Sequence, residues 1–223
     1  MPELLDAVEI ETGKNPAASV IWMHGLGADG NDFVPIVEEL DLPPTPIRFV
    51  FPHAPMQPVT INGGMVMRAW YDISDASIRR EDEGGVRASQ ALVEALIERE
   101  RARGTKPGRL VLAGFSQGGA IALHTGLRQP LRLAGIMALS TYVPIPGKLA
   151  AEASAANRDT PIFMAHGTQD PVIPLPLATQ SRDLLQSLGH AVEWHQYGMP
   201  HSVCAEEVRD IGAWLIRVLG APT

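Results

Sequence analysis

Short runs rich in Val and Ile alternate with amphipathic stretches along nearly the whole chain, and this alternation limits the fold more than any other feature. Short apolar runs bounded by turns are typical of buried strands, whereas apolar residues three or four positions apart indicate helices. Strands that alternate with helices predict an α/β fold with a mostly parallel central sheet and helices on both faces. The runs expected as strands are 20–23, 47–51, 110–112, 136–139, 162–164 and 192–197.

The segments between these runs predict helices, with two irregular regions. We expect helices over 86–103, 117–129, 177–188 and 202–219, the last with Ser202 as its N-cap. Residues 4–15 predict an edge hairpin that leads into the strand at 20–23. Residues 52–83 are rich in Pro and Gly and predict a loop with a short hairpin near the active face. The length of 223 residues, without a linker or a large insertion, predicts one domain over 1–223.

Composition excludes several classes of function. The 25 Asp and Glu outnumber the 18 Lys and Arg, which argues against nucleic-acid binding through the phosphates. The lone cysteine, Cys204, cannot form an internal disulfide, and neither a Cys cluster nor an H-E-x-x-H motif indicates a metal site. No apolar run approaches the roughly 18 residues of a membrane span, and the first residues do not resemble a secretory signal. We therefore expect a cytoplasmic protein without stable membrane insertion.

The segment from Gly114 to Gly118 matches the pattern G-x-S-x-G, with Ser116 at its centre. It follows an apolar run and precedes a helical pattern, which is the strand-turn-helix context that this motif requires. The bare pattern arises by chance in roughly one such chain in ten, so this context carries the prediction. The sharp turn raises the Ser116 hydroxyl above the sheet and directs the Gln117 N–H at a developing oxyanion. Ser116 is the predicted nucleophile.

An acid and a histidine follow Ser116 in the order that this motif predicts. Asp170 comes just after the apolar run 162–164, and His201 comes just after the run 192–197. Asp159 precedes its strand and Asp183 lies inside a helix, so neither is a good rival. The other histidines precede Asp170 or lie before or within the last strand. We expect neutral His201 to act as the base and Asp170 to orient its ring.

The loop from His24 to Gly30 has two interpretations. Its glycines fit the dinucleotide pattern G-x-G-x-x-G, but the next strand ends without the acidic residue that would hold a ribose. In a hydrolase the same loop supplies a second oxyanion donor, and the backbone N–H of Leu26 is the expected one. His24 is expected to be structural, bonded within the loop.

Four segments, 24–33, 114–120, 166–171 and 200–202, resemble the phospholipase/carboxylesterase family, which includes acyl-protein thioesterases and small bacterial carboxylesterases. Residues 69–72 are similar to a Trp-aromatic-Asp segment of that family. The resemblance implies an α/β-hydrolase fold without a large lid domain and without a cofactor. It implies the triad Ser116, Asp170 and His201, with Leu26 and Gln117 as oxyanion donors. Some members of the family are dimers, so the resemblance leaves a homodimer open.

The leading functional hypothesis is a serine carboxylesterase that hydrolyses carboxylic esters of short to medium acyl chains through an acyl-enzyme intermediate. The alternative is an acyl-protein thioesterase or lysophospholipase that acts on long acyl chains. In either case the substrate is a small-molecule or lipid-like ester. A binding protein that has lost the chemistry is disfavoured because all three triad residues are present. Residues that could line an acyl pocket, or equally pack in the core, are Met65, Trp70, Phe115, Tyr142 and Val143.

Overall fold

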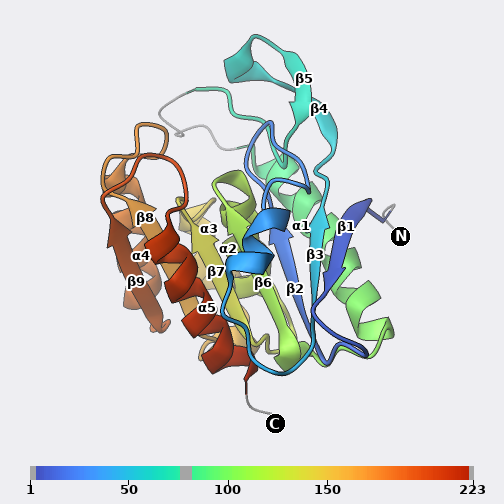
Figure 1. The fold of residues 1–223 in the computed structure, drawn as a ribbon. Coiled ribbons are helices and arrows are strands. Elements are labelled where there is room, and N and C mark those ends of the chain that lie inside the picture. Colours follow the sequence, from blue (N-terminus) through green and yellow to red (C-terminus); the bar gives the residue numbers. More distant parts are fainter. Residues whose placement is uncertain (1–3, 76–81, 221–223) are drawn as a thin grey trace.

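A single seven-stranded sheet forms the centre of the computed structural model, which describes residues 4–75 and 82–220 (Figure 1). All six runs expected as strands lie in this sheet. Its strand order is β1-β3-β2-β6-β7-β8-β9. The strands are β1 (Ala7–Glu11), β2 (Ala18–Met23), β3 (Ile47–Pro52), β6 (Leu110–Phe115), β7 (Gly135–Leu139), β8 (Ile162–Gly167) and β9 (Val192–Tyr197).

The first strand pairs differently from the prediction. An edge hairpin would place β1 beside β2, but β1 runs antiparallel to β3, with Ala7 opposite Pro52 and Glu11 opposite Arg48. The prediction of an edge hairpin is therefore wrong, although β1 does lie at the edge of the sheet. All other neighbouring strands of the sheet are parallel. This pairing gives the backbone groups on the outer edge of β3 their hydrogen-bond partners.

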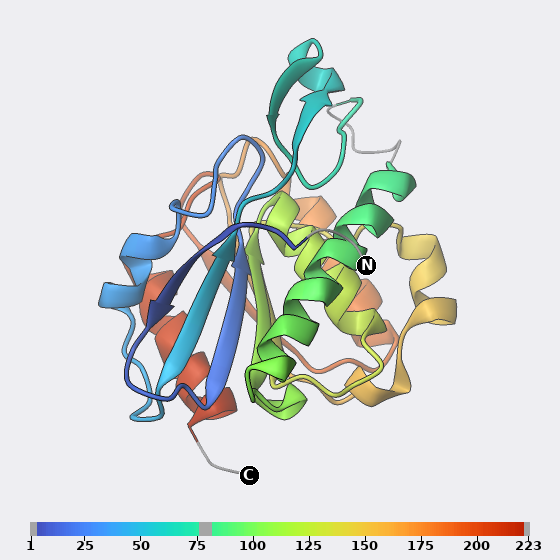
Figure 2. The same cartoon turned by 90° about the vertical axis from the view of Figure 1, so that its right-hand side faces the viewer.

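Helices cover both faces of the sheet, as the alternating pattern predicts (Figures 1 and 2). One face carries α1 (Glu83–Ala102), α2 (Gln117–Arg128), α3 (Pro146–Glu152) and α4 (Leu175–Ser187). The other face carries α5 (Ala205–Leu219) and the short 3-10 helix η1 (Val34–Glu39). Every residue of β2, β3, β7 and β8 is buried. Strands covered on both faces need apolar residues at every position, which explains their continuous Val and Ile runs.

Two helices differ from their predictions. The last helix begins at Ala205 with Cys204 at its N-cap, so Ser202 is not the cap. The Ser202 N–H instead donates to the Pro200 carbonyl within a turn. The helix α3 was not predicted, because its seven residues are too few to show a helical period.

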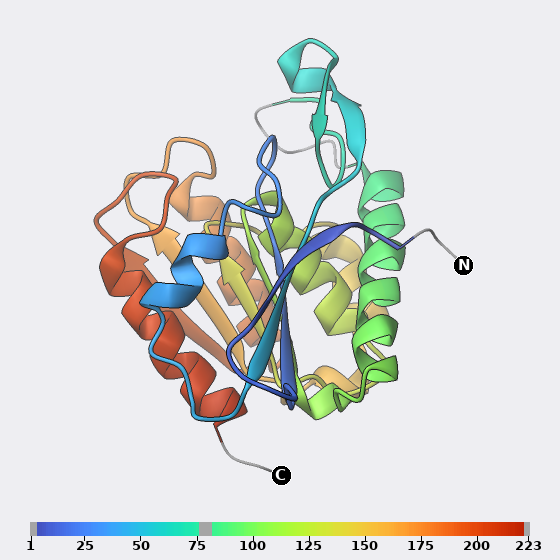
Figure 3. The same cartoon turned by 45° about the vertical axis from the view of Figure 1, so that its right-hand side comes forward.

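A β-hairpin extends beyond the carboxyl ends of the parallel strands (Figure 3). It consists of β4 (Met56–Val59) and β5 (Met65–Arg68), joined through the 3-10 turn η2 (Thr60–Asn62) and two glycines with positive φ. We call this hairpin the arm. It confirms the hairpin expected within 52–83, of which residues 76–81 lie outside the described part of the chain. Among the described residues, none of the helices has the length and apolar character that crossing a bilayer requires.

Candidate active site

The candidate residues gather where the strand order of the sheet reverses. β3 lies on one side of β2 and β6 lies on the other, so the loops after β2 and β6 diverge at the carboxyl end of the sheet. Crevices at such switch points are the usual ligand sites of open α/β sheets. Leu26 follows β2 and Ser116 follows β6, while Asp170 and His201 lie in the loops after β8 and β9. The sheet therefore brings residues from four distant segments to one edge.

Ser116 occupies a strained turn between β6 and α2. Its φ of 55° and ψ of −120° lie in a region that non-glycine residues seldom adopt. A Cβ on Gly114 would lie 2.2 Å from the Gly118 backbone, and one on Gly118 would lie 2.3 Å from the Met23 carbonyl oxygen. Thr141 donates its hydroxyl to the Ser116 carbonyl at 2.7 Å. The two glycines thus permit the turn, and hydrogen bonds hold it.

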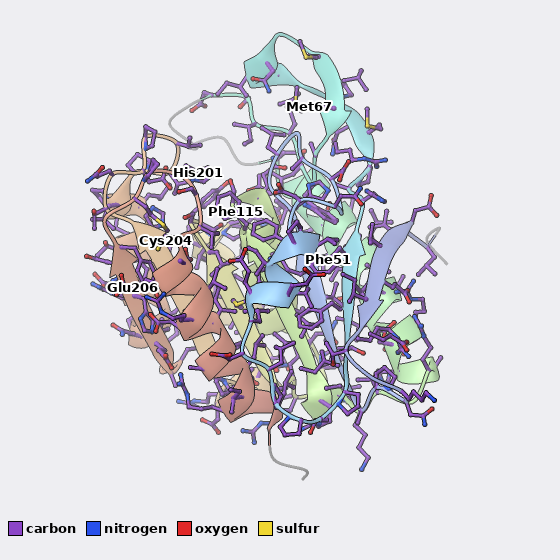
Figure 4. All side chains as sticks on the ribbon, viewed as in Figure 1. Phe51, Met67, Phe115, His201, Cys204 and Glu206 are labelled. Carbon is purple, nitrogen blue, oxygen red and sulfur yellow. The ribbon has the colours of Figure 1, made fainter. Side chains whose placement is uncertain are left out.

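Asp170 and His201 form a direct hydrogen bond. His201 Nδ1 lies 2.7 Å from Asp170 Oδ2, and Oδ1 of the same carboxylate accepts the backbone N–H groups of Val172 and Ile173 at 2.8 and 2.9 Å. A carboxylate only accepts, so Nδ1 carries the proton and Nε2 is left with its lone pair. The His201 ring packs on Phe115, with 4.7 Å between ring centroids (Figure 4). Because Phe115 directly precedes Ser116, His201 contacts the turn that carries the predicted nucleophile.

A second histidine, His166, lies behind the Asp170 carboxylate. Its Nε2 is 2.9 Å from the Ile173 carbonyl and 3.5 Å from Asp170 Oδ2. The carbonyl can only accept, so His166 donates from Nε2 and braces the loop that carries Asp170. Burial lowers the pKa of His166, which keeps this ring neutral. The negative charge of Asp170 is therefore available to His201.

Leu26 and Gln117, the two expected oxyanion donors, line the same cavity as Ser116. Gln117 is the first residue of α2, and the first N–H groups of a helix have no acceptor within it. A Cβ on Gly25 would lie only 3.4 Å from Ser116 Cβ, so the loop that carries Leu26 closely approaches the nucleophile turn. The Gly27 N–H donates to the Arg68 carbonyl at 2.9 Å. The glycine loop thus packs between the turn and the arm, and the next element is the 3-10 helix η1 rather than the α-helix of a dinucleotide site.

His24 is structural, as expected. Its Nε2 accepts the Ala54 N–H at 3.1 Å, and its Nδ1 lies 2.7 Å from the Gly25 carbonyl. These two contacts require a neutral ring protonated on Nδ1. Burial lowers the pKa of His24, in agreement with that state.

A cavity of about 300 Å³ opens over Ser116. Apolar side chains from the arm, from the segment after it and from the Asp170 loop form most of its wall. Of the five residues suggested for an acyl pocket, Tyr142 is among the lining residues. The residues that line the cavity are Leu26, Ile61, Asn62, Tyr71, Ile73, Asp75, Ser116, Gln117, Tyr142, Pro171, Val172 and Ile173.

The other four suggested pocket residues lie elsewhere. Trp70 and Val143 are buried in the core, and Phe115 packs on the His201 ring. Met65 is 64% exposed on the arm. Most residues of the actual lining were not predicted from the sequence. The three residues directly after Asp170 carried a signal, since they continue the loop that holds a predicted triad residue.

Comparisons with known proteins agree with this geometry. The model of the phospholipase/carboxylesterase family matches residues 5–218. Acyl-protein thioesterase 1 of Neurospora crassa is 42% identical, over 96% of this chain and 90% of that protein. The crystal structure of Arabidopsis thaliana SOBER1 superposes with a TM-score of 0.86 at 32% identity, over 91% of this chain and 99% of that one. Acyl-protein thioesterase 2 of Zea mays superposes with a TM-score of 0.83 at 28% identity, over 96% and 100% of the two chains.

The family match spans nearly the whole chain, and the described residues form an α/β-hydrolase fold without a large lid domain. The chain therefore belongs to the phospholipase/carboxylesterase family and is a serine ester hydrolase.

Proposed function

We propose that this enzyme removes medium to long acyl chains from thioesters and carboxylic esters, as an acyl-protein thioesterase does. The observation that carries the proposal is the apolar cavity at Ser116, whose lining includes the exposed apolar side chains of Ile61 and Val172. Short to medium acyl chains are the leading hypothesis from the sequence, and long acyl chains are the alternative. The apolar lining with its exposed apolar rim favours the second hypothesis.

The chemistry proceeds in two acyl transfers. The Ser116 hydroxyl attacks the acyl carbonyl carbon while His201 Nε2 takes the hydroxyl proton. Collapse of the tetrahedral intermediate expels the thiol or alcohol, which His201 protonates, and leaves the acyl group on Ser116. Water, deprotonated by His201, then releases the fatty acid. Asp170 keeps the proton on Nδ1 and stabilises the imidazolium that forms in each half-reaction.

Two backbone donors stabilise the charge that develops on the carbonyl oxygen. The Leu26 and Gln117 N–H groups come from different segments, and both residues line the cavity together with Ser116. Loss of one such donor typically costs about 10²–10³ in kcat. The position of Gln117 at the N-terminus of α2 adds the positive end of the helix dipole.

The acyl chain would lie along an apolar path. Ile61 and Val172 line the cavity and are 42% and 53% exposed, so they form its rim. Each methylene buried on such a surface contributes about 0.8 kcal/mol, so affinity should grow with chain length. The curated relatives named acyl-protein thioesterase 1 support thioesters as substrates.

The test is a chain-length series with wild type and Ser116→Ala. p-Nitrophenyl esters from acetyl to palmitoyl, and a palmitoyl thioester, would be compared by kcat/KM. We expect kcat/KM to rise with chain length and Ser116→Ala to lose at least about 10³-fold. An optimum at acetyl or butyryl, with no thioester cleavage, would favour the short-chain carboxylesterase instead. Full activity of Ser116→Ala would show that another residue is the nucleophile.

A further inference from the structure

Trp70 contacts both segments that carry the oxyanion donors. It lies in the segment that joins the arm to α1 and is 1% exposed. Its indole Nε1–H donates to the His24 carbonyl at 2.9 Å, and its backbone N–H donates to Gln117 Oε1 at 3.0 Å. Its carbonyl accepts the Ser89 hydroxyl, which anchors it to α1. One residue therefore joins the Leu26 loop, the start of α2 and the core.

The residues beside Trp70 reinforce the same two segments. Gln117 Nε2 donates to the Tyr71 carbonyl at 2.8 Å, so the amide of Gln117 is held at both ends. The Gly27 N–H donates to the Arg68 carbonyl at 2.9 Å. The Leu26 peptide is thus held on its amino side through His24 and on its carboxyl side through Gly27.

The distance between the two donors depends on such tertiary contacts, because Leu26 and Gln117 are far apart in the chain. A displacement of about 1 Å in a catalytic geometry can cost about 10²-fold in rate. We propose that Trp70 is a positioning residue that sets the two oxyanion N–H groups relative to each other. This inference rests on the proposed acyl transfer at Ser116. It also replaces the acyl-pocket role first suggested for Trp70, which is not among the residues that line the cavity.

A second buried tryptophan offers a matched control. Trp22 in β2 is also 1% exposed, and it packs on Phe33 with 5.3 Å between ring centroids. Within the described part of the chain, its Nε1 has no hydrogen-bond partner. Trp22→Phe therefore removes a similar volume from the core without breaking an indole hydrogen bond, whereas Trp70→Phe removes the bond to the His24 carbonyl.

The experiment compares wild type, Trp70→Phe and Trp22→Phe. For Trp70→Phe we expect kcat on p-nitrophenyl acetate to fall about 10- to 100-fold, with KM within about twofold. The inhibition constant of an alkyl trifluoromethyl ketone, which forms an oxyanion on Ser116, should rise by a similar factor. The pH midpoint of kcat/KM should not move, because the Asp170–His201 bond is untouched. Trp22→Phe should keep its kcat although it too loses stability.

The inference is overturned if Trp70→Phe loses no more kcat than Trp22→Phe, or if KM alone changes. If Trp70→Phe does not fold, Gln117→Met serves instead, because it removes both side-chain bonds to residues 70 and 71 without leaving a large cavity. A wild-type kcat in that variant would overturn the inference equally. Ser116→Ala distinguishes failure of the proposed function from failure of this inference. If Ser116→Ala stays active, the proposed function is wrong. If Ser116→Ala is inactive while Trp70→Phe keeps wild-type activity, only the role of Trp70 is contradicted.

Discussion

Glu207 is a buried carboxyl group whose ionisation should oppose folding. It lies in the first turn of α5 and is fully buried, and within the described residues neither side-chain oxygen has a hydrogen-bond partner at normal distance. The backbone N–H of Cys204, at the N-cap three residues earlier, stabilises the ionised carboxylate but offsets only part of the cost of its burial. Burial, with the nearby Asp210 carboxylate adding to it, raises the pKa of Glu207 to about 8. Glu207→Gln keeps the shape of the side chain and removes the ionisation.

The sign of the effect follows from proton binding. Below a pH of about 4.5, the ordinary pKa, Glu207 is protonated in both states, and its neutral form imposes no pH dependence. Between that pH and about 8 the unfolded chain releases the proton while the folded protein keeps it. The free energy of unfolding therefore falls by about 1.4 kcal/mol per pH unit, or by about 4 to 5 kcal/mol across the window. Local relaxation and water entry reduce such penalties, so we expect a measured loss of about 2 kcal/mol or more.

Urea unfolding at pH 5 and pH 8.5 measures this difference. The stability of Glu207→Gln relative to wild type should increase by about 2 kcal/mol or more between the two pH values. The change with pH is the observable, because the buried amide has its own cost at both values. Glu206→Gln is the control: Glu206 lies in the same helical turn but is exposed (Figure 4). A stability difference that stays constant with pH, or that moves equally in the control, would refute the reasoning.

Three further changes test the site. Asp170→Asn should lower kcat by about 10⁴-fold in the ester assay, because the amide favours the wrong tautomer of the catalytic imidazole; a loss under tenfold would contradict the role of this residue. Gly118→Ala should abolish activity and cost about 2 kcal/mol or more in urea unfolding, because its Cβ would lie 2.3 Å from the Met23 carbonyl oxygen. Gly147→Ala, with open space around its Cβ, is the matched control and should stabilise by up to about 1 kcal/mol. Ile61→Asn should lower kcat/KM about tenfold for a palmitoyl ester and leave acetyl unchanged; equal losses on both would remove this residue from the acyl path.

Features encoded within a few neighbouring residues could be predicted from the sequence. The apolar runs identified six strands of the main sheet, because strands covered on both faces need apolar side chains at every position. Gly114 and Gly118 identified the nucleophile turn, because in that sharp turn a Cβ atom at either position would collide with backbone atoms. Asp170 and His201 were predicted from their places after strands, since parallel strands bring their carboxyl ends to one edge.

Features that depend on partners far along the chain were decided only by the tertiary structure. One such feature was the pairing of β1 with β3 rather than with β2, because an edge strand can form its backbone hydrogen bonds with either strand. The lining of the cavity was another, since the arm, the segment after it and the Asp170 loop meet only in the folded chain. Trp70 shows the reason most clearly. Its pattern fitted an acyl pocket, but its hydrogen bonds join residues 24 and 117, and a local pattern carries no information about contacts across such separations.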